Sequence, residues 1–171
     1  MAIKSKILLA IASGLLLALA MPRPGIWLLA WVALVPLITA LRNTTPLRGA
    51  AFGLIAGLAY FGIILVWMRI FGNLPWALLV AVEALFIALF AAAATWLMPS
   101  RIGWMGYIGV PAAWTAIQWL RSLGAYSFTW GSFAHLQANN LPVAQLGALT
   151  GPWGIDFLVC LFNLALAEAV L

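Results

Sequence analysis

Residues 75–98 have the sequence PWALLVAVEALFIALFAAAATWLM, in which a single charged side chain, Glu83, interrupts an apolar run. A stretch of about 20 apolar residues is long enough to cross the hydrocarbon core of a bilayer as a helix. A helix also satisfies its backbone hydrogen bonds within one segment, as hydrocarbon requires. This stretch therefore predicts a transmembrane helix.

The rest of the chain has the same character. Of its 171 residues, 67% are hydrophobic and only 6% are charged, whereas a soluble domain has about 25% charged residues. The sequence predicts an all-α fold in which residues 1–171 form a single polytopic transmembrane helical bundle of about six spans, with no soluble domain. Prolines, glycines and single cations separate the apolar segments, at about residues 7–20, 26–41, 49–71, 75–98, 103–120 and 153–170.

The first segment has two interpretations. Lys4 and Lys6 precede an apolar run that ends in Ala-Leu-Ala at residue 20, a pattern that also suits a cleavable signal peptide. Five further apolar segments follow, however, and the break MPRPG at residues 21–25 suits a turn between two helices. We expect the first span to be retained.

The cations predict the orientation of the chain. Three of them, Arg23, Arg69 and Arg121, fall in odd-numbered connections, and the other five fall at the N-terminus or in even-numbered connections. Cytoplasmic loops carry the excess of Lys and Arg, so the N-terminus is predicted to be cytoplasmic. The net charge of +5 comes from isolated cations without a basic stripe, which indicates contacts with lipid headgroups and no nucleic-acid partner. The five cations at the N-terminus and in the even-numbered connections are Lys4, Lys6, Arg42, Arg48 and Arg101.

One connection differs from the others. Residues 121–142, RSLGAYSFTWGSFAHLQANNLP, are too polar to span a membrane and too aromatic for an ordinary solvated loop. Aromatic rings with polar tips settle at the depth of the headgroups. This predicted periplasmic loop is either an interfacial segment at the outer leaflet or a surface presented to an amphiphilic substrate. Its aromatic rings belong to Tyr126, Phe128, Trp130, Phe133 and His135.

Glu83 is a functional candidate by position, because a carboxylate in the middle of a span is costly. The alternative is a protonated or paired side chain, and Arg69 is a possible partner. Asp156 and Glu168 lie near the two ends of the last segment and are predicted to be structural.

No set of residues with catalytic or metal-ligand spacing is apparent. The chain has one histidine and one cysteine, which excludes His-rich or Cys-containing zinc sites, and it has no glycine-rich phosphate loop. Ser127 or Ser132, His135 and Asp156 could be assembled on paper into a triad, but their spacing does not support one. Cys160 lies in the last apolar segment, where a thiol is inert. We therefore predict no catalytic residue, no metal and no cofactor.

Four stretches, in this order, resemble the bacterial apolipoprotein N-acyltransferases. Residues 15–41 contain a Pro-rich turn and then WVALVPL, and residues 53–67 are a glycine-rich span that ends in Trp. Residues 111–137, PAAWTAIQWLRSLGAYSFTWGSFAHLQ, are similar to the family's Pro-x-x-Trp, Leu-Arg, Phe-x-Trp and Gln pattern. Residues 141–159 are similar to its Pro-Leu-x-Gln-Leu stretch. Two positions depart from the family: Gln118 stands where Glu is usual, and Thr129 where Pro is common.

The resemblance implies a reaction for the complete protein. A phospholipid donates an acyl group to a catalytic cysteine, and the N-terminal cysteine amine of an apolipoprotein then takes it. In the family, a periplasmic nitrilase-like domain supplies a Glu–Lys–Cys triad, which residues 1–171 do not contain. We therefore expect this chain to be the membrane half, inactive alone, in the bacterial inner membrane. Three interpretations stay open: a truncated gene, a partial sequence and a stand-alone relative.

The resemblance also implies lipid-binding residues. We expect the loop at 121–142 to hold acyl chains and headgroups through Arg121, Phe128, Trp130 and Gln137, with Arg121 on a lipid phosphate and Trp130 at the acyl–headgroup boundary. In the alternative, Arg121 only snorkels and Trp130 only marks the interface. Two other classes remain open: a small transporter or channel that uses Glu83, and a non-catalytic scaffold for a separately encoded soluble enzyme.

Overall fold

The computed structural model describes residues 1–98, 102–124 and 127–170. Every regular element in these ranges is helical, so the predicted all-α fold is confirmed. Arg101 and Tyr126, which contributed to the predicted orientation and to the aromatic loop, lie outside the described residues. The elements are α1 (Ile3–Ala20), the 3-10 helix η1 (Trp27–Trp31), α2 (Val35–Leu41), α3 (Pro46–Ile64), the 3-10 helix η2 (Val66–Phe71), α4 (Asn73–Leu97), α5 (Trp104–Arg121), α6 (Phe133–Leu136) and α7 (Leu141–Val170).

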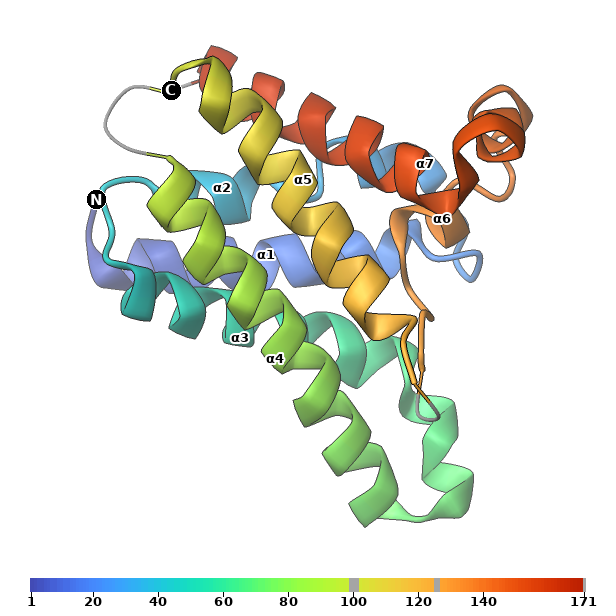
Figure 1. The fold of residues 1–171 in the computed structure, drawn as a ribbon. Helices are drawn as coiled ribbons and strands as arrows, with labels where there is room; N and C mark the ends of the chain where they lie inside the picture. Colours follow the sequence, from blue (N-terminus) through green and yellow to red (C-terminus); the bar gives the residue numbers. More distant parts are fainter. Residues whose placement is uncertain (99–101, 125–126, 171) are drawn as a thin grey trace.

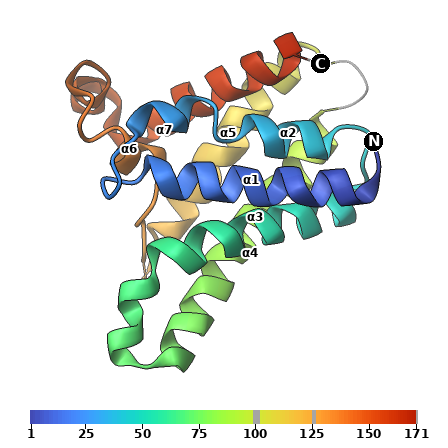
Figure 2. The same ribbon diagram turned by 180° about the vertical axis from the view of Figure 1, so that it is seen from behind.

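The helices run back and forth between two ends of the molecule (Figure 1). The start of α1, the connection from α2 to α3 and the end of α7 lie at one end, which we call the N-terminal end. The end of α1, the end of α5 and α6 lie at the other, which we call the α6 end (Figure 2). This alternation is what a chain that crosses a membrane repeatedly requires.

Four of the described helices, α1, α3, α4 and α7, are long and apolar enough to cross a membrane by length and composition. With the shorter apolar helices they form the polytopic helical bundle that the composition predicts. α5 is as long as α1 but less apolar. The number of six spans therefore stays a prediction.

The predicted second segment, 26–41, is not one helix. It divides into η1 and α2, with Pro36 in the first turn of α2, where the missing N–H of proline costs no hydrogen bond. Asn163 of α7 reaches this break: its Oδ1 accepts a hydrogen bond from the Leu34 N–H at 2.8 Å, and its Nδ2 donates to the Ala30 carbonyl at 2.9 Å. The interrupted backbone thus finds partners inside the protein, as hydrocarbon demands.

α3 and α4 pack backbone against backbone. A Cβ atom added at Gly53 would lie 2.5 Å from the Ala91 Cβ, and one added at Gly57 would lie 2.7 Å from the Ala84 Cα. Only glycine permits this approach, which is how small residues join helices where lipid surrounds them. This pair of helices is therefore held together by close backbone packing rather than by large side chains.

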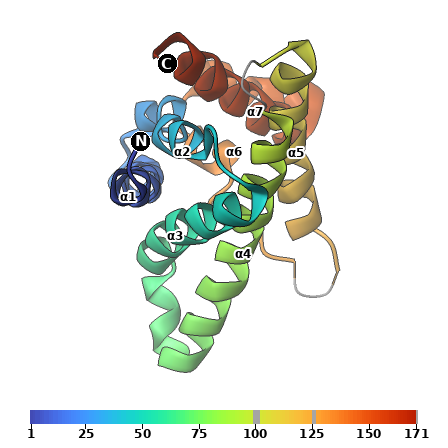
Figure 3. The same cartoon turned by 90° about the vertical axis from the view of Figure 1, so that its left-hand side faces the viewer.

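The predicted third segment, 49–71, contains α3 and then η2. After η2, Gly72 adopts a φ of 114° and turns the chain into α4. The corner formed by η2 and the start of α4 projects from the rest of the bundle (Figures 1 and 3). Leu74 and Leu78 on the first turns of α4 are consequently exposed.

The predicted sixth segment, 153–170, is the second half of α7. Gly151, with φ 65° and ψ −170°, and the following Pro152 interrupt α7, because this conformation favours glycine and proline cannot continue a helix. Residues 141–150 therefore form a separate helical arm at the α6 end (Figure 1).

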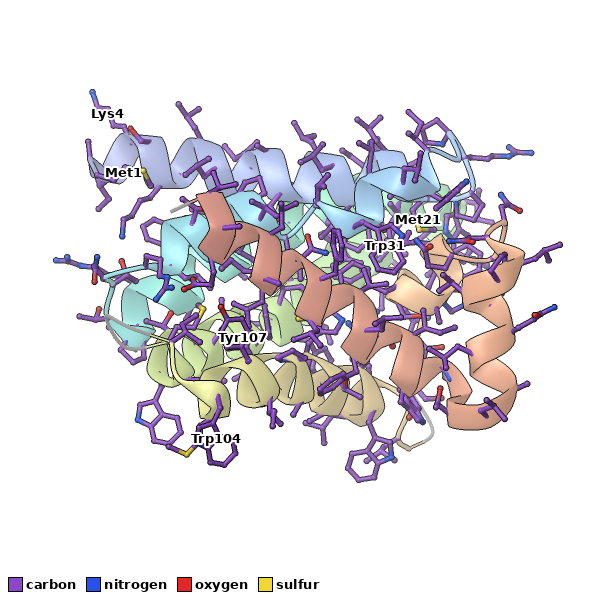
Figure 4. All side chains as sticks on the ribbon, turned by 90° about the horizontal axis from the view of Figure 1, so that it is seen from above. Met1, Lys4, Met21, Trp31, Trp104 and Tyr107 are labelled. Atoms are coloured by element: carbon purple, nitrogen blue, oxygen red, sulfur yellow. The ribbon has the colours of Figure 1, made fainter. Side chains whose placement is uncertain are left out.

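The core at the α6 end is aromatic. The Trp114 ring of α5 packs edge-on against Phe90 of α4, with ring centroids 4.8 Å apart, and at a tilt against Phe133 of α6, with centroids 4.9 Å apart. Figure 4 shows Met21 and Trp31 among the side chains of the same end, while Lys4 reaches outward at the N-terminal end. Aromatic contacts thus anchor the predicted interfacial loop in the protein interior.

Candidate functional site

A buried ion pair joins α4 to α5. The Arg121 Nε donates to Glu83 Oε2 at 2.6 Å, and the two side chains are only 1% and 3% exposed, respectively. The suggestion that Arg69 is the partner of Glu83 is wrong. Arg69 lies on the projecting η2 corner, donates to Asn73 and covers the Trp76 ring. Glu83 instead points inward, where the end of α5 approaches α4.

The remaining guanidinium nitrogens of Arg121 are also occupied. Nη1 donates to Gln118 Oε1, one turn earlier on α5, and Nη2 donates to the Trp130 carbonyl at 2.7 Å. The guanidinium also lies 5.1 Å from the centroid of the Phe61 ring of α3. A planar five-donor group suits this many-sided contact. A snorkelling Arg121 with its head in water does not describe this geometry.

A cavity of about 450 Å³ lies beside this pair. Ligand pockets commonly have volumes of about 300–1,000 Å³, with apolar walls and few polar groups. Here the charged groups are those of Glu83 and Arg121. The apolar walls include Leu78, Val82 and Phe86 of α4, Leu120 of α5, and Leu123 and Phe128 of the following loop.

The four residues expected to bind lipid occupy three different positions. Arg121 and Phe128 both line the cavity. Trp130 is 43% exposed and lies outside the cavity, with its ring 5.7 Å from that of His135. Gln137 is fully buried elsewhere: it donates to the Trp27 carbonyl and accepts a hydrogen bond from the Trp31 indole, joining the end of α6 to η1. The structure thus brings the first two together and separates Gln137 from them.

The residues of the hypothetical triad do not form one in the described part of the chain. His135 Nδ1 lies 2.7 Å from Ser132 Oγ, but the Asp156 carboxylate accepts a hydrogen bond from the Phe133 N–H. No hydrogen bond between the described His135 and Asp156 side chains accompanies these contacts. Burial, with a smaller contribution from the positive charge of Arg121, lowers the pKa of His135 below its usual value. Ser127 is exposed.

Sequence reasoning missed the buried side chains of Tyr60 and Asn163, which make long-range contacts. It named Gln118 only as a departure from the family pattern and did not predict its bond to Arg121. Gln118 and Arg121 are three residues apart, so their shared helix face could be read from the sequence. The general signal was a polar residue within an apolar helix, which points to a partner without identifying it.

The comparisons with known proteins agree with the resemblance found in the sequence. The family described as "Apolipoprotein N-acyltransferase N-terminal domain" matches residues 13–165. Apolipoprotein N-acyltransferase of Geobacter metallireducens is 34% identical over 95% of this chain and 33% of its own length. The corresponding protein of Gloeobacter violaceus is 32% identical over 95% of this chain and 34% of its own length. This chain therefore spans about a third of the length of these curated relatives.

Proposed function

The chain belongs to the apolipoprotein N-acyltransferase family, whose N-terminal domain it matches, and on this premise we propose that it positions phospholipid for acyl transfer to a lipoprotein. The observation that carries the proposal is the apolar cavity between α4 and the end of α5, beside the Glu83–Arg121 pair. We assign this cavity to one acyl chain of the phospholipid donor. The catalytic step itself requires residues that the described chain does not bring together.

The cavity must compete with the bilayer for the acyl chain. Lipid tails are as apolar as leucine side chains, so the hydrophobic effect alone does not move a tail from the bilayer into the protein. Close packing against Phe86 and Phe128 is one source of preference. A contact between the headgroup and the exposed, amphipathic Trp130 is the second.

Arg121 contributes to the wall of the cavity. A direct contact with a lipid phosphate would require it to give up a bond to Glu83, Gln118 or the Trp130 carbonyl. We therefore propose that Phe128 contacts the acyl chain and that Trp130 contacts the headgroup region. A contact between Arg121 and the lipid phosphate is proposed only together with the loss of one of these three bonds.

The protein is an apolar, helical protein of the bacterial envelope. We propose that it lies in the inner membrane with the N-terminal end in the cytoplasm, so that the α6 end faces the periplasm. Lys6 and Arg42, which contact one another at the N-terminal end, support this orientation. A cysteine introduced at exposed Ser127 should then react with an impermeant maleimide on intact spheroplasts, and one at exposed Arg48 should not. The reverse pattern would refute the orientation.

Photolabelling tests the cavity. The chain is reconstituted in nanodiscs that contain a phosphatidylethanolamine with a diazirine at the middle of one acyl chain. We expect crosslinks within residues 78–86 and 120–128, and we expect Val82→Trp, which fills the cavity, to reduce them. Leu89→Trp is the matched control, because Leu89 is an exposed residue of the same helix and does not line the cavity. Equal crosslinking in the two variants would contradict the proposal.

A further inference from the structure

Side chains from three helices form hydrogen bonds with the main chain of the loop after α5. The Trp130 carbonyl accepts a hydrogen bond from Arg121 Nη2 at 2.7 Å, and the Gly131 carbonyl accepts one from the Tyr60 hydroxyl at 2.8 Å. The Phe133 N–H donates to Asp156 Oδ1 at 2.8 Å. Three backbone groups within four residues are thus bound by buried side chains from α5, α3 and α7.

The loop sequence is adapted to these contacts. Gly131 has a φ of 82°, and a Cβ atom at this position would lie 2.7 Å from the Tyr60 hydroxyl oxygen. Glycine is therefore required for the conformation and for the approach of Tyr60. The Phe133 ring is fully buried against Trp114, which holds the next part of the loop in place.

Glu83 acts on the loop through Arg121. Its carboxylate binds Nε, while Gln118 binds Nη1, so the planar guanidinium is fixed on two edges and directs Nη2 at the Trp130 carbonyl. The Phe128 N–H in turn donates to the Arg121 carbonyl at 2.9 Å. The ion pair thereby connects α4 to the same stretch of loop that carries Phe128 into the cavity.

We propose that Tyr60, Glu83 and Asp156 are positioning residues that clamp the main chain of residues 128–133 and make this loop a fixed wall of the cavity rather than a lid. The role of the cavity rests on the proposed function, whereas the clamp does not. With the loop fixed, the acyl chain enters sideways from the bilayer, past the exposed Leu78 and Val82 of α4. Glu83 then serves position rather than proton or solute transfer.

Amide hydrogen exchange of the whole chain in nanodiscs tests the clamp. Tyr60→Phe removes one hydroxyl and keeps the ring, so we expect exchange of amides 128–137 to accelerate about three- to tenfold, the factor that one net hydrogen bond represents. Tyr107→Phe is the matched control, because Tyr107 lies in the N-terminal half of α5, away from the loop (Figure 4). Unchanged loop exchange in Tyr60→Phe would overturn the clamp.

A second pair of variants tests the Glu83–Arg121 ion pair. Glu83→Gln should accelerate the same loop amides, whereas Glu168→Gln, which breaks the Arg42–Glu168 pair at the other end of the molecule, should not. Amides of α1 and α3 that exchange through global unfolding should also accelerate, because loss of the buried pair lowers the global stability. Among amides that exchange by local opening, an acceleration no larger in the loop than in α1 and α3 would count against a positioning role. Tyr60→Phe remains decisive if Glu83→Gln does not fold.

Photolabelling separates this inference from the proposed function. With the diazirine lipid, Tyr60→Phe should lower the crosslinks to residues 120–128 relative to those to residues 78–86, a ratio that a uniform loss of folded protein does not change. If the native chain gives no crosslinks at the cavity, the proposed function fails, and hydrogen exchange still decides whether the clamp exists. An unaltered ratio in a chain that does crosslink would refute the fixed wall.

Discussion

Arg121 and Glu83 carry opposite charges into a part of the protein that water scarcely reaches. Desolvation of both groups is costly, and the remaining guanidinium nitrogens of Arg121 offset part of this cost by donating to Gln118 and to the Trp130 carbonyl. Such a pair adds little net stability compared with apolar side chains, but the loss of one member leaves a buried charge alone.

The first prediction concerns the cost of removing one member of this buried pair. Glu83→Gln should lower the free energy of unfolding by about 3–5 kcal/mol, because Arg121 would keep its charge without a counterion. Glu168→Gln, at a pair whose side chains are 13% and 18% exposed, should cost about 1 kcal/mol or less. Thermal unfolding in detergent, followed by circular dichroism, measures both. Equal losses of unfolding free energy in the two variants would show that burial does not increase the cost of breaking the Glu83–Arg121 pair.

Trp130 gives the second prediction. In a full-length fusion of this chain to the remaining two-thirds of the Geobacter metallireducens relative, Trp130→Ala should reduce N-acylation of a lipopeptide about fivefold, the factor that corresponds to about 1 kcal/mol. The reduction follows from the lost headgroup contact, and the variant should fold normally. Trp104→Ala is the control, because Trp104 is also an exposed tryptophan but lies at the start of α5 (Figure 4). Undiminished N-acylation would remove Trp130 from the site.

His135 gives a prediction about pH. Burial lowers its pKa in the folded protein, so protonation favours the unfolded chain, whose histidine has its ordinary pKa of about 6.5. The stability associated with a neutral His135 is therefore complete above that value and is lost as the pH falls below it. His135→Gln should flatten the decline in melting temperature between about pH 7 and pH 5. Parallel pH profiles for the two proteins would contradict this.

At the scale of elements, the contact between α3 and α4 depends on the absence of side chains. Gly57→Val should push α3 away from Ala84 and lower the free energy of unfolding by about 1–3 kcal/mol, the usual cost of overpacking. Gly62→Val tests the same change on the same helix, and a Cβ there meets nothing within 4 Å. Thermal unfolding compares the two variants. A similar loss in both would indicate helix propensity rather than packing as the cause.

The sequence predicted the elements where apolarity and small residues are local properties. It could not predict the break in residues 26–41, because the side chain that satisfies this break, Asn163, lies 129 residues further along from Leu34. The same reason applies to the site. Arg121 and Phe128, named as lipid-binding residues from the resemblance, both line the cavity, and their role stays a prediction. The partner of Glu83 is 38 residues away, and its identity could not be read from the sequence. Arg69 was nearer in sequence, yet the projecting η2 corner carries it away from the bundle.

At the scale of the whole molecule, the proposed lipid cavity and the single cysteine lie in different places. The cavity lies between α4, the end of α5 and the following loop, whereas the single cysteine of the sequence, Cys160, is completely buried in α7. A thiol in that position cannot reach an acyl donor at the surface. Cys160 is therefore not placed to form a thioester with a lipid acyl group.

This division gives the last prediction. The purified 171-residue chain, reconstituted with phospholipid and a diacylated peptide that bears a free N-terminal cysteine amine, should give no N-acylated product. The full-length Geobacter metallireducens relative in the same vesicles serves as the positive control. Mass spectrometry of the peptide measures the product, and its appearance with this chain alone would overturn the prediction.

The bond from Asn163 to the break between η1 and α2 also bears on biosynthesis. Residues 30–34 leave the ribosome well over a hundred residues before Asn163 does, which at about 5–20 residues per second is a delay of roughly ten seconds. During that time the nascent segment that becomes η1 and α2 holds the Ala30 carbonyl and the Leu34 amide without their final partner. The insertion machinery, or water retained beside it, must shelter these groups until α7 arrives.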